Sequence, residues 1–187
     1  VIYGLRRDVR DAKKLGQYIV EQKLGEGGMG AVYRAQHGML KRPTAVKLLG
    51  PDRNTPEDLE RFRREVQMTA KLKHPNTVTI FDYGRTEDGT FYYAMELLEG
   101  VTLHEIVVND GMQPEARVVH ILFQCAMALQ EAHSIGLVHR DIKPNNIMMT
   151  EQGGVHDVTK VLDFGLVKQI DATTDAPNTL SEVIIGS

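Results

Sequence analysis

The sequence predicts an α+β fold in which an antiparallel β-sheet with one main helix precedes a mainly helical part. Short runs rich in β-branched and aromatic residues dominate the chain up to Leu97, and helix start signals dominate after Gly100. We therefore expect a β-rich first domain over residues 18–97 and a helix-led second domain over residues 98–187. Residues 1–17 carry alternating charges without a clear apolar period, which is typical of a flanking segment.

Seven strand patterns follow one another along the chain. The first three are bounded by Gly or Pro, as the strands of an antiparallel sheet commonly are. The fourth and fifth flank a turn with Gly84 and Gly89 and predict a hairpin, and the last two flank Gly153-Gly154. In order, the patterns cover residues 18–20, 31–33, 45–49, 77–83, 90–97, 147–149 and 159–162.

Three helix patterns have recognisable start signals. Thr55, directly before a proline, begins an amphipathic pattern of about four turns. Thr102 and Glu105 form a capping-box pattern that predicts a short helix, and Pro114 begins a long helix that Gly136 would end. In the long helix, the apolar side chains that should share one face are Val118, Leu122, Cys125, Leu129 and Ala132.

Composition and charge argue against several classes of protein. Of 187 residues, 42% are hydrophobic and 25% are charged, which is ordinary for a globular protein. With 22 Lys and Arg against 25 Asp and Glu, the net charge of −3 gives no basis for a nucleic-acid or anionic-membrane partner. No apolar run approaches the ~20 residues needed to cross a bilayer. The only cysteine, Cys125, cannot form an internal disulfide, which favours a reducing, cytoplasmic compartment.

The segment from Gly25 to Gly30 contains the pattern G-x-G-x-x-G. A P-loop would need Lys directly after the last glycine, where Ala31 stands, so that class of nucleotide site is excluded. A dinucleotide fingerprint would need the glycines to open a helix, whereas residues 31–33 have a strand pattern. A glycine-rich hairpin whose backbone N–H groups approach a polyphosphate fits better, and a plain surface turn stays open on this motif alone. The glycines concerned are Gly25, Gly27, Gly28 and Gly30.

Three further motifs lie downstream of the glycine pattern. The strand pattern at residues 45–49 holds Lys47 in T-A-V-K, residues 139–146 are H-R-D-I-K-P-N-N, and residues 163–165 are D-F-G. With these motifs the chain resembles the eukaryotic-type serine/threonine protein kinases, in particular those of bacteria, over about residues 18–187. The three motifs are similar to the family's V-A-I-K strand, its H-R-D-x-x-x-x-N catalytic loop and its D-F-G element.

The resemblance implies a protein kinase-like fold. Residues 18–97 would be the antiparallel small lobe with one main helix, and residues 98–187 a truncated, mainly helical large lobe. Gly186-Ser187 looks like the start of the family's G-[ST]-P-x-Y segment, after which the peptide-binding shelf and later helices would follow. Since those helices normally cover the helix at residues 114–136, we expect it to expose apolar surface and the fragment alone to transfer little phosphate.

The resemblance also implies roles for the polar residues of these motifs. Lys47 would bind the α- and β-phosphates and pair with Glu65 of the first helix. Asp141 would accept the proton of the substrate hydroxyl. Lys143 is typical of the serine/threonine class, in which it steadies the transferred phosphate, so Ser and Thr hydroxyls are the expected acceptors.

ATP and Mg²⁺, or Mn²⁺ in its place, are the cofactors that the resemblance implies. Asn146 and Asp163 would hold the metal, because carboxylate and amide oxygens suit a small hard cation, and nothing in the sequence indicates a zinc site. Glu96 and Leu98 would bind adenine through their backbone, and the glycine hairpin would cover the phosphates. The apolar walls of the adenine pocket would be Leu24, Val32, Ala45, Val78, Met95, Met148 and Leu162.

Two further residues of the catalytic-loop motif have implied structural roles. His139 would pack against Phe164 and take no part in proton transfer. Arg140, beside Asp141, resembles the kinases whose activation loop is ordered by phosphorylation, because such an arginine favours an anionic partner. At least one hydroxyl after Asp163 is therefore expected to be an autophosphorylation site. The candidates are Thr173, Thr174, Thr179 and Ser181, of which the last two are favoured.

The sequence thus predicts an ATP-dependent protein serine/threonine kinase that acts on protein substrates in signalling, with self-association as one route to autophosphorylation. Two other classes stay open. A nucleotide-binding pseudokinase would usually lack one of Lys47, Asp141 and Asp163, and all three are present. A small-molecule kinase of related fold would be expected to differ around Lys143-Pro144.

Overall fold

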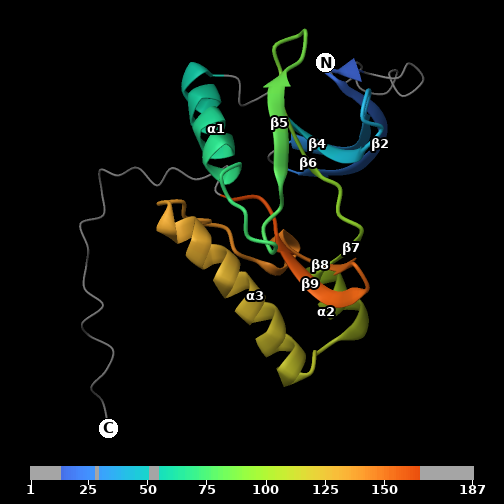
Figure 1. Cartoon of the computed structure of the whole chain (residues 1–187), viewed down its shortest axis with the longest axis vertical. Coiled ribbons are helices and arrows are strands. Elements are labelled where there is room, and N and C mark those ends of the chain that lie inside the picture. Colours follow the sequence, from blue (N-terminus) through green and yellow to red (C-terminus); the bar gives the residue numbers. More distant parts are fainter. Residues whose placement is uncertain (1–13, 28–29, 51–54, 165–187) are drawn as a thin grey trace.

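Two antiparallel β-sheets with their flanking helices form the protein in this computed structural model, which describes residues 14–27, 30–50 and 55–164. The first sheet has the strand order β1-β2-β3-β4-β6-β5 and the second the order β7-β8-β9 (Figure 1). The expected α+β class is confirmed. The first sheet consists of β1 (Lys14–Leu15), β2 (Tyr18–Gly27), β3 (Gly30–His37), β4 (Pro43–Leu49), β5 (Ile80–Arg85) and β6 (Phe91–Glu96). The other elements are α1 (Pro56–Thr69), β7 (Gly100–Thr102), α2 (Leu103–Asp110), α3 (Glu115–Ser134), β8 (Ile147–Gln152) and β9 (Val155–Val161).

Alternation along the strands gives the first sheet two packed faces. Val46 of β4 lies in an apolar cluster on one face. The opposite face carries Tyr93 of β6, which packs with Phe62 and Val66 of α1. Lys47, which follows Val46 and lies opposite Tyr93 in the β4–β6 register, therefore lies on the α1 face. The sheet and α1 together place this lysine in a largely apolar setting.

The strand β1 differs from the expectation that residues 1–17 only flank the fold. Leu15 pairs with Tyr18 across the β1–β2 ladder. It is 2% exposed and belongs to the apolar cluster on the face away from α1. Burying one leucine stabilises a fold by roughly 1.5–3 kcal/mol, so the Leu15 side chain helps to attach β1 to the sheet.

The helix signals are confirmed in α2 and α3. Thr102 accepts a hydrogen bond from the Glu105 N–H (3.1 Å), and the Glu105 carboxylate accepts one from the Thr102 N–H (2.7 Å), which completes the capping box of α2. Pro114 precedes α3, and Gly136 follows it with φ of 77°, a left-handed conformation that costs glycine little. Helix α1 has 14 residues, in agreement with the expected four turns.

Both predicted hairpins are present, with strand ends that differ from the predicted ones. Gly153-Gly154 connects β8 to β9 as predicted. Gly84, expected in a turn, instead lies inside β5, and the turn falls near Gly89. A Cβ atom on Gly84 would come 2.7 Å from the Tyr92 hydroxyl oxygen, so close packing against β6 is the reason for this glycine.

The predicted apolar face of α3 is buried toward its C-terminal end. Cys125 and Ala132 are buried, whereas Val118 and Leu122 are 38% and 55% exposed. Arg117 and Gln124 form hydrogen bonds with residues of β9, so the side of α3 that carries them faces the second sheet. The buried residues of α3 are Ile121, Cys125, Ala128 and Ala132.

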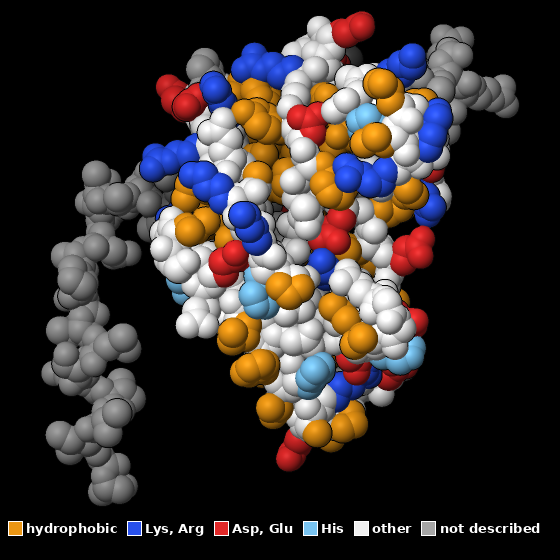
Figure 2. All heavy atoms as spheres, in the orientation of Figure 1, with side chains coloured by type: hydrophobic (Ala, Val, Ile, Leu, Met, Phe, Trp, Pro, Cys, Tyr) orange, Lys and Arg blue, Asp and Glu red, His pale blue; other side chains and the backbone are white. Residues whose placement is uncertain are grey.

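The outer side of α3 exposes apolar side chains, as expected. Val119, Leu122 and Phe123 are 66%, 55% and 64% exposed. Figure 2 shows apolar side chains gathered over the part of the surface where α3 runs. None of the helices among the described residues is both long enough and apolar enough to span a membrane.

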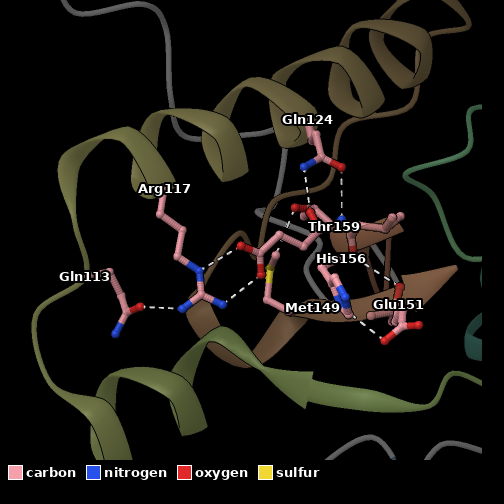
Figure 3. Close-up of polar contacts among 10 residues, drawn as sticks. Gln113, Arg117, Gln124, Met149, Glu151, His156 and Thr159 are labelled. Atoms are coloured by element: carbon pink, nitrogen blue, oxygen red, sulfur yellow. Dashed lines mark hydrogen bonds and ion pairs between the residues drawn. The ribbon is translucent and has the colours of Figure 1, made fainter. Parts of the chain in front are cut away.

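Polar side chains join α3 to the second sheet (Figure 3) and to the loop after α1. Arg117 donates two hydrogen bonds to the Asp157 carboxylate, at 2.9 and 2.7 Å. Gln124 donates to the Asp157 carbonyl (2.9 Å) and accepts from the Thr159 N–H (3.0 Å). The amide nitrogen of Asn76 donates to the same Gln124 oxygen (2.8 Å) and to the Thr159 carbonyl (2.7 Å). Three segments far apart in the sequence therefore share one hydrogen-bond network.

Glu131 attaches the same loop to α3. Its carboxylate accepts hydrogen bonds from the backbone N–H groups of Lys73 (2.9 Å) and His74 (2.8 Å). Bonds from backbone N–H groups to a charged acceptor are stronger than neutral ones. The loop after α1 is therefore fixed to α3, although it belongs to the connections of the first sheet.

We expect Glu131→Ala to lower the free energy of unfolding by about 1.5–3 kcal/mol, since two backbone N–H groups lose a charged acceptor. Urea denaturation of both proteins measures the difference. The matched control is Gln130→Ala on the exposed side of the same helix, which should change stability by no more than about 0.5 kcal/mol. If both variants changed the free energy of unfolding by the same small amount, Glu131 would not attach the loop after α1 to α3.

Candidate active site

A partly buried ion pair joins the two sheets at the centre of the candidate site. Lys47 Nζ lies 2.6 Å from Asp163 Oδ1, and the lysine is 5% exposed. Asp163 comes two residues after the end of β9 and has φ of 51°, a conformation that non-glycine residues keep only where the surroundings hold it. The pair brings a predicted phosphate ligand and a predicted metal ligand into direct contact.

The predicted catalytic loop is held by short polar contacts around Asp141. Lys143 Nζ lies 2.8 Å from Asp141 Oδ2. The Asn146 amide nitrogen donates to the Asp141 carbonyl (2.8 Å) and to the same Oδ2 (3.0 Å). The Lys143 hydrogen bond, above all, lowers the pKa of Asp141 from its ordinary value, with a smaller effect from Asn146. Asp141 is therefore a carboxylate at neutral pH, as a proton acceptor must be.

His139 ties the catalytic loop to the residues around Asp163. It is 1% exposed, and its ring packs on that of Phe164 with a centroid distance of 4.8 Å, as expected. Nε2 lies 2.7 Å from the Leu162 carbonyl, and Nδ1 accepts from the Asp141 N–H (3.3 Å). These contacts fix the neutral tautomer with its proton on Nε2, and burial lowers the pKa of His139. The imidazole therefore has a structural role.

The residues predicted to hold a metal fit that role chemically. The Leu162 N–H donates to the Asn146 carbonyl (2.9 Å), so Asn146 lies beside the residue that precedes Asp163. Because Asn146 uses its amide nitrogen toward Asp141, its amide oxygen is the atom that could ligate a metal. Carboxylate and amide oxygens suit Mg²⁺ or Mn²⁺, which usually take their other ligands from phosphates and water. Within the described ranges there is no cluster of three or more His, Cys, Asp or Glu side chains that could hold an ion.

Glu65 lies on α1 directly before Val66, which is fully buried in the cluster that contains Tyr93. The helix thus places Glu65 beside the sheet face that carries Lys47. Its Oε2 atom has less than 1 Å² of accessible surface. The ion pair between Glu65 and Lys47 that the resemblance implies stays a prediction.

The glycines of the G-x-G-x-x-G pattern have two different surroundings. A Cβ atom on Gly30 would come 1.8 Å from the Leu48 carbonyl oxygen, so this glycine is required by the packing of β3 on β4. Added Cβ atoms on Gly25 and Gly27 would meet no atom within 4 Å. Those two positions leave the backbone open to a ligand. Gly28 lies outside the described residues, as do Gly165 and the candidate hydroxyls at 173–181.

The predicted adenine-pocket residues come from both sheets. Val32 pairs with Lys47, and Ala45 pairs with Met95, so these side chains line one face of the first sheet. Leu24 lies on β2 and is 50% exposed. The second sheet supplies Met148 on β8, with Leu162 just after β9, and Leu98 lies in the connection between the two sheets. Val78, also predicted, is 4% exposed.

Glu96 forms a second, partly buried ion pair between the sheets, which the sequence did not predict. Its carboxylate accepts from Lys160 Nζ (2.8 Å) and from the Thr79 N–H (2.8 Å). The Glu96 N–H donates to the Thr79 carbonyl (2.9 Å), so the backbone group that could meet adenine is the Glu96 carbonyl. Lys160 is 4% exposed. Sequence reasoning missed this lysine because a single charged residue in a strand pattern normally faces solvent.

Comparison with known proteins gives one consistent result. A family model described as "Protein kinase domain" matches residues 18–184. The chain is 41% identical to the serine/threonine-protein kinase pkn3 of Myxococcus xanthus over 162 residues, which are 86% of this chain and 30% of that protein. It is 39% identical to the serine/threonine-protein kinase PknA of Mycobacterium tuberculosis over 177 residues, which are 92% of this chain and 39% of that protein.

Solved structures agree with these relatives. The chain superimposes on the crystal structure of the Mycobacterium tuberculosis PknI kinase domain with a TM-score of 0.74 and 31% identity. The match covers 84% of this chain and 62% of that structure. The chain thus spans about a third of the length of the first two relatives and about two thirds of a solved kinase domain.

We expect Lys143→Ala to raise the pKa of Asp141 toward its ordinary value, because the Lys143 hydrogen bond is the main cause of the depression. A depressed pKa means that the fold favours the ionised form, so the variant should protonate Asp141 at a higher pH than the wild type. Carboxyl-carbon NMR titration measures this. Asp157, whose pKa Arg117 lowers, serves as the internal control and should not change. An unchanged Asp141 titration would contradict the assigned cause.

Proposed function

The chain belongs to the protein kinase family, and we propose that it transfers the γ-phosphoryl group of ATP to serine or threonine hydroxyls of proteins. One observation carries the proposal: Lys47 contacts Asp163 at 2.6 Å, and Asp163 adjoins the loop of Asp141 and Asn146 through the Leu162 backbone. The relatives named serine/threonine-protein kinases support the same activity.

Asp141 is proposed as the proton acceptor for the substrate hydroxyl. Its lowered pKa keeps it ionised, and its bonds to Lys143 and Asn146 fix its orientation. Lys143 is close enough to neutralise charge on the transferred phosphoryl group once a substrate lies over Asp141. Lys47, paired with Glu65, is proposed to bind the α- and β-phosphates. Catalysis would then arise mainly from positioning and from neutralisation of charge.

The proposed metal is Mg²⁺, with Mn²⁺ as an alternative, held by Asn146 and Asp163. When bound, such a metal would neutralise charge on the phosphates. Asn146 and Asp163 act here as oxygen donors, and the contact of Asn146 with Asp141 keeps the proton acceptor beside them.

ATP is proposed to lie between the two sheets, with its phosphates under the glycine hairpin. Glu96 and Leu98 would bind adenine through their backbone groups. The proposed binding residues are Leu24, Gly25, Gly27, Gly28, Gly30, Val32, Ala45, Lys47, Met95, Glu96, Leu98, Met148 and Leu162.

The proposed lobes are residues 18–97 and residues 98–187, of which the second is a partial large lobe. The first sheet ends at Glu96 and the second begins at Gly100, which supports this boundary. Protein substrates, a signalling role, autophosphorylation between two copies and a cytoplasmic compartment are parts of the same proposal. The single buried Cys125 supports a reducing compartment.

A radiolabelled-ATP assay on the full-length protein tests the proposal. We expect label on serine or threonine of a protein acceptor, and Asp141→Asn should lower the rate about 10²–10⁴-fold, as loss of a general base does. The matched control is Asp110→Asn, an exposed aspartate at the end of α2, which should leave the rate unchanged.

The assay also separates the alternatives. A pseudokinase would bind nucleotide without transferring label, and a small-molecule kinase would label only a small acceptor. A rate for Asp141→Asn within a few-fold of wild type would show that the assigned proton acceptor is wrong.

A further inference from the structure

Tyr93 places a buried hydroxyl at the centre of the candidate site. The residue is 2% exposed, and its ring lies in the cluster with Phe62 and Val66 of α1. Its hydroxyl donates a hydrogen bond to Asp163 Oδ1 at 3.1 Å. A buried phenol needs a polar partner, and Asp163 supplies it.

Two donors from the first sheet meet at one carboxylate oxygen. Lys47 Nζ also contacts Asp163 Oδ1, at 2.6 Å. Lys47 and Tyr93 lie directly opposite each other on β4 and β6, so the sheet fixes the distance between them. Asp163, in contrast, follows β9 of the second sheet. Both contacts use Oδ1, and neither uses Oδ2.

The two donors would have different partners when a nucleotide is bound. In the proposed function Lys47 binds the α- and β-phosphates, so its long, flexible side chain would contact a second anionic group besides Asp163. The Tyr93 side chain is rigid and enclosed, and its hydroxyl carries no charge that would repel a cation. It can therefore keep its bond to Oδ1, which would leave Oδ2 available to a metal. Groups that hydrogen-bond a metal-binding carboxylate typically change metal affinity 10–100-fold when removed.

We propose that Tyr93 is a positioning residue for the metal site: its hydroxyl holds Oδ1 of Asp163 and thereby orients the carboxylate for a divalent cation. The inference rests on the proposed function, which makes Asp163 a metal ligand. It adds a residue outside the T-A-V-K, H-R-D and D-F-G motifs. It also explains why a tyrosine is needed at this position, because phenylalanine has no hydroxyl to donate to Asp163 Oδ1.

The test is the Mg²⁺ dependence of nucleotide binding in the full-length protein, which requires no phosphotransfer. Fluorescence anisotropy of a fluorescent ATP analogue is measured while MgCl₂ is titrated. Tyr93→Phe keeps the ring in the core and removes only the hydroxyl. We expect the Mg²⁺ concentration at half-maximal effect to rise about tenfold or more, with binding of the metal-free analogue within about twofold of wild type.

The matched control is Tyr83→Phe. Tyr83 pairs with Tyr93 in the β5–β6 register, but its hydroxyl accepts from Gln67 Nε2 (2.9 Å) at an exposed position. This variant should leave the Mg²⁺ midpoint unchanged. Tyr93→Met, an apolar side chain that adapts to the same core position, is a second variant and should reproduce the shift of Tyr93→Phe.

The outcomes separate this inference from the proposed function. A wild-type Mg²⁺ response with an unshifted midpoint in Tyr93→Phe would overturn the role of Tyr93 and leave the kinase proposal standing. The role of Tyr93 would also be overturned if the Mg²⁺ midpoint of Tyr83→Phe shifted as much as that of Tyr93→Phe. The same holds if Tyr93→Phe weakened binding of the metal-free analogue as much as binding in the presence of Mg²⁺, because a general structural effect would then explain the result. A wild type that binds no nucleotide with or without Mg²⁺ would overturn both proposals.

Discussion

The contact between Lys47 and Asp163 is the constraint on which the candidate site depends. An ion pair removed from water is costly unless further hydrogen bonds satisfy its atoms, and Lys47 is buried while Asp163 is partly buried. Here Tyr93 supplies an additional donor to the carboxylate. Because Lys47 and Tyr93 are fixed by the first sheet and Asp163 follows the second, the contact determines how closely the two sheets approach at this point.

Helix α3 supports this arrangement from outside the site. Gln124 bonds both Asn76, in the loop after α1, and Thr159 of β9, while Glu131 holds the backbone of the same loop. The helix that carries Glu65 and the sheet that leads to Asp163 are thus attached to one rigid element. The second ion pair, between Glu96 and Lys160, joins the sheets again near the proposed adenine position.

The parts of the site that the sequence predicted are those whose geometry is local. Asp141 and Asn146 belong to one short loop, so their spacing alone brings the Asn146 amide within 3.0 Å of the Asp141 carboxylate. Tyr93 and Lys160 were not predicted, because each faces its partner only through strand register and the contact between sheets. For the same reason the apolar pattern of α3 predicted the helix but could not show that Val118 and Leu122 would be exposed while Cys125 and Ala132 are buried.

By itself the sequence determined the order of seven strands and three helices, the capping box of α2 and the motifs of a protein kinase domain, because turns, caps and catalytic loops depend on residues that are neighbours in the chain. Only the tertiary structure decided that Lys47, 116 positions from Asp163 in the chain, and Tyr93 both contact Oδ1 of Asp163. Contacts of that range depend on register and on the packing of one sheet against the other, and neither leaves a local pattern in the sequence.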